Sequence, residues 1–145
     1  LQLRPNNVEA LTNRAALFYS LKQYDAARQD LDRALALDPN RPEALNNVAL
    51  LLARDGKPAD ALRYVEKALT QRPNQPYYVN NKAYFLLLLN RDAEALPLLR
   101  NALRLDAQNA WAYRNLGLYH LKRSEFSEAR TALQRSEQLD ASVDE

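Results

Sequence analysis

The sequence predicts an all-α fold, a solenoid of about eight antiparallel helices arranged as four stacked helix pairs. Three observations lead to this prediction. The chain repeats itself every 34 residues, each repeat carries two stretches with apolar residues at helical spacing, and small residues recur at fixed positions. Because neither helix of a pair can bury its apolar stripe alone, the pairs must stack on one another.

The repeat begins at Val8 and returns at Pro42, Pro76 and Ala110 without an insertion. The sixth position is always asparagine and the twentieth is always alanine. These residues are Asn13, Asn47, Asn81 and Asn115, and Ala27, Ala61, Ala95 and Ala129. Small side chains at the twentieth position let neighbouring helices approach closely.

The period also sets the domain organisation. We expect one continuous domain with repeats over 8–41, 42–75, 76–109 and 110–143. Residues 1–7 match the last seven positions of another repeat, so we expect them to be the tail end of a preceding one.

In the first repeat, Leu11, Ala15 and Phe18 keep one apolar face at spacings of three and four residues, which predicts a helix over 8–21. A short polar connection, "KQYD", follows. The next apolar stripe predicts a second helix over 25–38, closed by "DPN".

The other three repeats follow the same pattern. It predicts helices over 42–55, 59–72, 76–89, 93–106, 110–123 and 127–139. Equivalent breaks fall at "DGKP", "LNRD" and "RSEF". Gly56 and Asn90 stand at two of these breaks and suit the left-handed backbone conformation that ends many helices.

Composition argues against catalysis. The 145-residue chain has no cysteine, which excludes disulfides, zinc thiolate sites and thiol nucleophiles. A metal site needs several converging ligands, and His120 is the only histidine. Gly56 and Gly117 lie in different repeats and form no phosphate loop. We therefore expect a protein that is not an enzyme and that uses no metal and no cofactor.

Charge and hydropathy exclude two further classes of partner. The net charge of +2 gives no electrostatic case for nucleic acid or for an anionic membrane surface. The longest apolar run, "AYFLLLL" over 83–89, is too short to cross a bilayer. We expect no nucleic acid and no membrane as partners of this segment, and no pattern in it indicates a cellular compartment.

These features resemble the tetratricopeptide repeat (TPR) family, a 34-residue helix–turn–helix with small, aromatic and proline signposts. The last repeat carries "YRNLGLYH" followed by Ala129 and Leu133, and the first ends in "LDPN". The resemblance covers 8–143. It implies a right-handed superhelix whose first helices line a concave groove, and it gives His120 a position where an aromatic ring usually packs.

The resemblance also places the sixth-position asparagines in a row along the groove. An asparagine side chain offers a donor and an acceptor, so it can pair with a peptide backbone in either polarity. The alternative is structural, with the same side chains bonding groups of a neighbouring helix. Both interpretations stay open for Asn13, Asn47, Asn81 and Asn115.

Other groove positions change in character along the chain. The second position runs Glu9, Glu43, Tyr77, Trp111, the fifth runs Thr12, Asn46, Asn80, Arg114, and the ninth contains Tyr84. Tyrosine, tryptophan and arginine dominate interface energies most often. The further candidates for binding a peptide or partner are Asn46, Asn80, Tyr77, Tyr84, Trp111 and Arg114. For Tyr78 and Tyr113 we favour packing between repeats.

Two functions follow from the resemblance. The first is a non-catalytic protein–protein interaction scaffold that binds a peptide or a partner protein in its concave groove. The alternative is a self-assembly module that forms homo-oligomers through its convex face or its ends, the exposed N-terminal end above all. A carboxylate clamp for chaperone tails is rejected, because only Asn47 matches its required positions.

Overall fold

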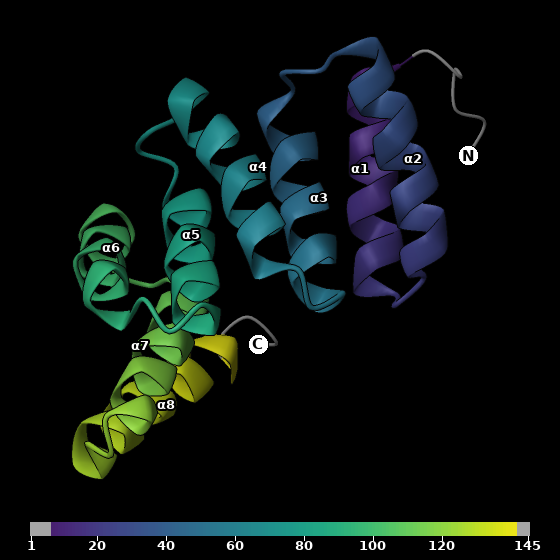
Figure 1. Cartoon of the computed structure of the whole chain (residues 1–145). Helices are drawn as coiled ribbons and strands as arrows, with labels where there is room; N and C mark the ends of the chain where they lie inside the picture. The colour runs from purple at the N-terminus through teal and green to yellow at the C-terminus, as the bar shows by residue number, and fades with distance from the viewer. Residues whose placement is uncertain (1–6, 142–145) are drawn as a thin grey trace. The chain divides into compact units, whose positions relative to one another are not determined.

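The computed structural model describes residues 7–141, with only the backbone of Ala141. Eight helices and no strand occur in this range (Figure 1). The helices are α1 (Val8–Ser20), α2 (Tyr24–Leu37), α3 (Pro42–Arg54), α4 (Pro58–Gln71), α5 (Pro76–Leu88), α6 (Asp92–Leu105), α7 (Ala110–Lys122) and α8 (Phe126–Ala141). The all-α prediction is confirmed, and every helix end lies within two residues of its predicted position. Residues 1–6 of the tail predicted over 1–7, and the end of the fourth repeat at 142–143, lie outside the described residues.

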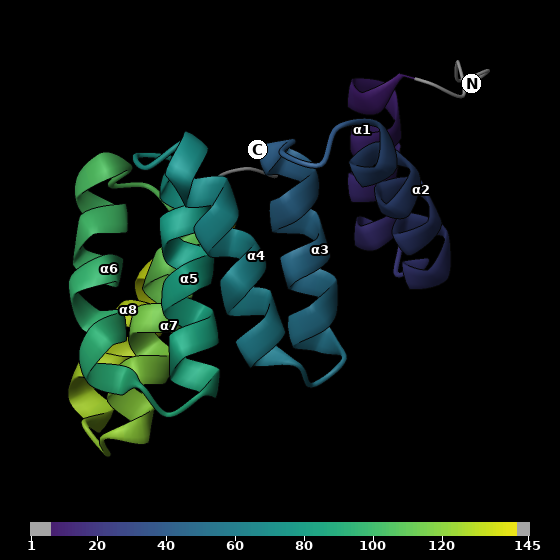
Figure 2. The same ribbon diagram turned by 45° about the horizontal axis from the view of Figure 1, so that its top comes forward.

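The chain divides into two compact units, unit 1 (Leu1–Arg72) and unit 2 (Pro73–Glu145). In unit 1, α1 packs on α2 and α3 packs on α4 (Figure 2). Helix α3 also contacts α1 and α2. Unit 2 repeats this arrangement, with α5 on α6, α7 on α8, and α7 against both α5 and α6. We call α1, α3, α5 and α7 the first helices, and their partners the second helices.

Alanine and leucine side chains form the core of both units. The cluster in unit 1 consists of Leu11, Ala15, Ala27, Leu31, Ala34, Ala44, Val48 and Leu51. In unit 2, Ala95, Leu99 and Ala102 are fully buried. Gly117 illustrates why small residues recur, because a Cβ added there would lie 2.7 Å from Leu133 Cδ2. At this contact the Leu133 side chain would have to shift to admit even one methyl group.

The turn inside each helix pair has the same backbone geometry in all four repeats. A residue with positive φ follows the first helix, namely Lys22 (60°), Gly56 (77°), Asn90 (59°) and Ser124 (59°). The next amide then bonds back to a carbonyl five residues earlier, as Gln23 N does to Phe18 O at 2.8 Å. This Schellman geometry satisfies carbonyl groups at the helix end. The left-handed conformations predicted for Gly56 and Asn90 are confirmed.

An ion pair joins the two helices of the first hairpin. The Arg14 guanidinium on α1 donates hydrogen bonds from Nε and Nη2 to the Asp30 carboxylate on α2, both at 2.6 Å. The Asp30 side chain is 4% exposed and that of Arg14 is 34% exposed. Hydrogen bonding to Asp30 raises the pKa of Arg14. In the fourth repeat, the positions of Arg14 and Asp30 are occupied by the apolar residues Leu116 and Ala132.

Candidate binding surface of the first helices

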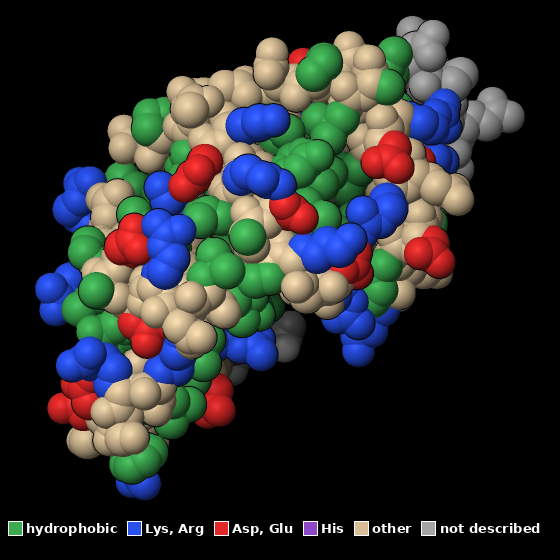
Figure 3. All heavy atoms as spheres, in the orientation of Figure 1, with side chains coloured by type: hydrophobic (Ala, Val, Ile, Leu, Met, Phe, Trp, Pro, Cys, Tyr) green, Lys and Arg blue, Asp and Glu red, His purple; other side chains and the backbone are tan. Residues whose placement is uncertain are grey.

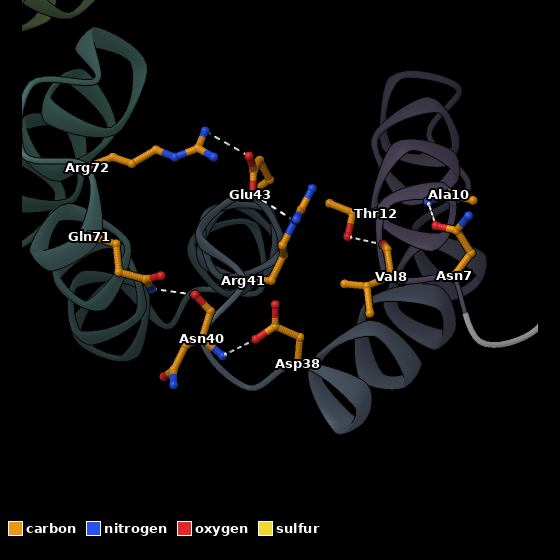
Figure 4. A network of polar contacts seen from close by, with 10 residues as sticks. All are labelled: Asn7, Val8, Ala10, Thr12, Asp38, Asn40, Arg41, Glu43, Gln71 and Arg72. Carbon is orange, nitrogen blue, oxygen red and sulfur yellow. Dashed lines mark hydrogen bonds and ion pairs between the residues drawn. The ribbon is translucent and has the colours of Figure 1, made fainter.

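In unit 1, the second position of the repeat is acidic, with Glu9 exposed on α1 and Glu43 paired on α3. Glu43, in the first turn of α3, lies between two arginines (Figure 4). Its carboxylate oxygens are 3.0 Å from Arg41 Nε and 2.8 Å from Arg72 Nη1. Gln71 of α4 also donates a hydrogen bond to the Asn40 carbonyl in the connection before α3. Glu43 therefore serves contacts inside the unit.

Charges of both signs surround the apolar surface of unit 1. Apolar side chains gather between α1 and α3, and basic and acidic side chains flank them (Figure 3). Arg28 and Asp55 form one further pair, at 2.5 Å. Most arginines of unit 1 thus form an ion pair with a carboxylate.

The candidate asparagines of unit 1 differ in exposure. Asn13 on α1 is exposed, and Asn47 on α3 is half-buried. Asn46, next to it, is 8% exposed. Asn13 and Asn47 can present an amide to solvent, whereas Asn46 belongs to the interior.

In unit 2 two of the candidate asparagines bond to each other. Asn115 Nδ2 on α7 donates to Asn80 Oδ1 on α5 at 2.9 Å. The residues are 8% and 2% exposed, so the bond satisfies polar groups in the interior. Asn81, also on α5, is half-buried. The sequence analysis did not predict this bond. Its only signal in the sequence is that the two asparagines lie 35 residues apart, one residue more than the repeat length.

The second position of unit 2 holds two exposed aromatic rings. Tyr77 on α5 is 52% exposed and Trp111 on α7 is 56% exposed. Arg114, one turn after Trp111, is exposed too, and its Cζ lies 5.5 Å from the centre of a Trp111 ring. This separation is within the range of a cation–π contact.

The remaining tyrosine candidates are less exposed. Tyr84 is half-buried, and its ring centre lies 5.9 Å from that of Phe85. Tyr78 is buried and Tyr113 is half-buried, in agreement with the packing role favoured for them. Of the five aromatic residues Tyr77, Tyr78, Tyr84, Trp111 and Tyr113, only Tyr77 and Trp111 leave about half of their surface open to a partner.

The first helices of unit 2 contain basic residues and no acidic ones. The charged side chains of α5 and α7 are those of Lys82, Arg114 and Lys122. Lys122 Nζ is engaged, with Asp92 Oδ1 at 2.6 Å and the Leu87 carbonyl at 2.5 Å. Arg114 has no carboxylate partner in the described part of the chain. Among residues 7–141, Arg114 is therefore a positive charge of this surface without a carboxylate beside it.

His120, the only histidine of the chain, makes packing contacts. His120 is half-buried, with its ring 5.2 Å from that of Tyr119 and its Nδ1 3.6 Å from Glu125 Oε2, as expected for a packing side chain. Among the described residues, no group of three or more His, Cys, Asp and Glu side chains could hold a metal ion. The described helices also include none that is long and apolar enough to span a membrane.

Family models described as tetratricopeptide repeat match residues 8–41, 47–110 and 89–143. No curated protein matches the chain by sequence. Among solved structures, the chain is similar to a thermophilic TPR protein of Thermus thermophilus, with a TM-score of 0.83 and 23% identity over 93% of this chain and 75% of that one.

Two further solved structures are similar. The first is PilW, described as a widely conserved type IV pilus biogenesis factor, with a TM-score of 0.80 and 24% identity over 94% of this chain and 64% of that one. The second is YrrB, described as a TPR protein with an unusual peptide-binding site, with a TM-score of 0.69 and 21% identity over 94% of this chain and 70% of that one. At these identities the similarity establishes the fold, an all-α TPR superhelix.

Proposed function

Since the chain belongs to the tetratricopeptide repeat family, whose members are generally non-catalytic protein–protein interaction scaffolds, we propose that it binds an extended peptide segment of a partner protein on the first helices of unit 2. The observation that carries the proposal is the pair of exposed rings, Tyr77 and Trp111, at equivalent positions of α5 and α7. Exposed tryptophan and tyrosine side chains are the most frequent binding hot spots. Tyr84, half-buried and seven residues after Tyr77 on α5, adds a third aromatic side chain to these helices.

The asparagines support the same function in two ways. The bond between Asn80 and Asn115 fixes α5 against α7 and so keeps the two ring-bearing helices in register. Asn13 and Asn47 on the first helices of unit 1 carry amides of the kind that pair with a peptide backbone in either direction, and Asn81 holds the same repeat position on α5. Asn46 is buried, and we assign it a supporting role like that of Asn80.

The test is a selection from a random-peptide display library on the immobilised protein, followed by titration of an enriched peptide. We expect Trp111→Ala to weaken binding about thirtyfold, which is the effect of removing a hot-spot side chain. Phe126→Ala is the matched control, because Phe126 is 67% exposed but lies on the second helix α8. It should bind the peptide as tightly as the unchanged protein does.

Two outcomes would contradict the proposal. One is a selection in which no peptide is enriched over an unrelated immobilised protein. The other is equal binding by the Trp111→Ala and Phe126→Ala variants. Light scattering on the same preparations addresses self-assembly, since an oligomer that Trp111→Ala dissociates would assign the rings to a contact between copies of the chain.

A further inference from the structure

The Trp111–Arg114 pair of unit 2 includes a positive charge with no carboxylate beside it in the described part of the chain. Two other arginines of this unit have a carboxylate partner, Arg91 in Glu94 at 2.6 Å and Arg123 in Glu125 at 2.5 Å. Arg114 packs instead beside the Trp111 ring, with no carboxylate partner among the described residues. The surface thus combines a flat apolar group with an available guanidinium.

The surroundings of Arg114 favour a negative charge. The helices α1, α2, α3, α4, α6 and α8 carry an acidic residue in the first turn, whereas α5 and α7 carry none. The positive ends of the α5 and α7 dipoles are therefore not compensated by an acidic side chain of their own first turns. At the start of α7, Asn109 is 3% exposed, and its Oδ1 accepts a hydrogen bond from Ala112 N at 3.2 Å. Its buried Nδ2 is a donor without a partner in the described part of the chain.

We propose that the Trp111–Arg114 surface recognises an internal acidic segment of a partner protein. An Asp or Glu side chain of that segment pairs with the Arg114 guanidinium, and a neighbouring apolar residue or proline packs on the Trp111 ring. This inference rests on the proposed function and adds the chemistry of the partner. A guanidinium offers paired donors that match a carboxylate, and packing on a ring orders it before the partner arrives.

The distribution of charge favours a peptide over a nucleic acid. Single-stranded nucleic acid also stacks on aromatic rings, but its binding sites need a basic groove that follows the backbone. Here Lys122 is bonded to Asp92, and the chain has a net charge of only +2. One unmatched guanidinium beside one ring suits a segment with one or two carboxylates.

The experiment compares peptide selections on the unchanged protein, on Arg114→Glu and on Arg100→Glu. Arg100 is exposed on α6, so its substitution changes the net charge equally on a second helix. We expect the unchanged protein and Arg100→Glu to enrich Asp or Glu beside an apolar residue. The peptides selected on Arg114→Glu should no longer be enriched in Asp or Glu and should instead be enriched in Lys or Arg.

A titration then isolates the carboxylate. The probe is an enriched peptide with an amidated C-terminus, compared with a version in which its Glu or Asp is changed to Gln or Asn. The neutral version should bind the unchanged protein about tenfold more weakly, as expected for losing a partly desolvated charged hydrogen bond. It should bind Arg114→Gln as tightly as the acidic version does.

Each other outcome has a definite meaning. Enrichment without an acidic preference, or equal affinities of the two peptides for the unchanged protein, would overturn this inference and leave the proposed function standing. A selection that enriches nothing would overturn both. If a peptide binds with a free C-terminus but not with an amidated one, the surface recognises a terminal carboxylate instead. If a labelled oligothymidylate displaces the peptide, and binds the unchanged protein but not Trp111→Ala, the surface recognises a nucleic acid.

Discussion

The two units share a repeat and a fold but use its second position in opposite ways. In unit 1 that position is acidic, and Glu43 is neutralised by Arg41 and Arg72. In unit 2 it holds Tyr77 and Trp111, each about half exposed, on helices without an acidic residue. The difference teaches that the repeat specifies helix packing through its small buried positions and leaves the first turn free to diverge.

The units also differ in where they use buried polar groups. Unit 1 places the Arg14–Asp30 pair inside one hairpin, between a first and a second helix. Unit 2 places the Asn80–Asn115 bond between two first helices, and Lys122 joins the same helices again through the Leu87 carbonyl. The surface proposed to bind a partner is thus built on helices that are fixed to each other at two points, which favours preorganised binding.

The largest expected effect concerns a core position that both units share. Leu31 on α2 and Leu99 on α6 are at most 1% exposed. Changing either to alanine should lower the free energy of unfolding by about 2–5 kcal/mol, because the leucine contacts are lost and a cavity remains. Since solenoid repeats depend mainly on their neighbours, hydrogen exchange measured by mass spectrometry should rise first in the unit that carries the substitution. Equal loss of protection in both units, in both variants, would mean that they unfold as one body.

The next effect tests the charged pair that is specific to unit 1. Arg14→Leu leaves the Asp30 carboxylate buried without its partner, at a cost of about 1–3 kcal/mol in the free energy of unfolding. Adding Asp30→Ala recreates the combination found at Leu116 and Ala132, so it should recover most of that loss. Urea denaturation of the single and double variants measures both values. A double variant less stable than Arg14→Leu would show that Asp30 stabilises the hairpin by other contacts.

The fold was predictable because its signals repeat in register, whereas the side-chain contacts of the surface were not. The period and the turn residues located all eight helices to within two residues. The exposure of Trp111 follows from its place in the first turn, and its contact with Arg114 follows helical spacing. The burial of Asn115 did not follow, because it depends on the residue that the neighbouring repeat presents. That residue is Asn80 in unit 2, and the fifth position of the first repeat holds Thr12 instead.

The smallest expected effect separates the two roles left open for the asparagines. Asn13 and Asn115 share the sixth position, but Asn13 is exposed and Asn115 is bonded to Asn80 in the interior. Asn115→Ala removes that bond, so the free energy of unfolding should fall by about 0.5–1.5 kcal/mol, less the gain from the better helix propensity of alanine. Asn13→Ala loses no such bond and should leave stability unchanged or raise it by roughly 0.5 kcal/mol. Thermal melting of the two variants compares these values directly.

Peptide affinity completes this comparison, because a bonded pair and a ligand contact change different quantities. If Asn115 serves mainly to hold α7 against α5, its alanine variant should lose stability and bind an enriched peptide only slightly less tightly than the unchanged protein does. Calorimetric titration on the preparations used for melting gives both numbers for one sample. An Asn115→Ala variant with unchanged stability and clearly weakened peptide binding would mean that the amide serves the ligand rather than Asn80. Asn115 would then be a ligand-binding residue rather than one that holds α7 against α5.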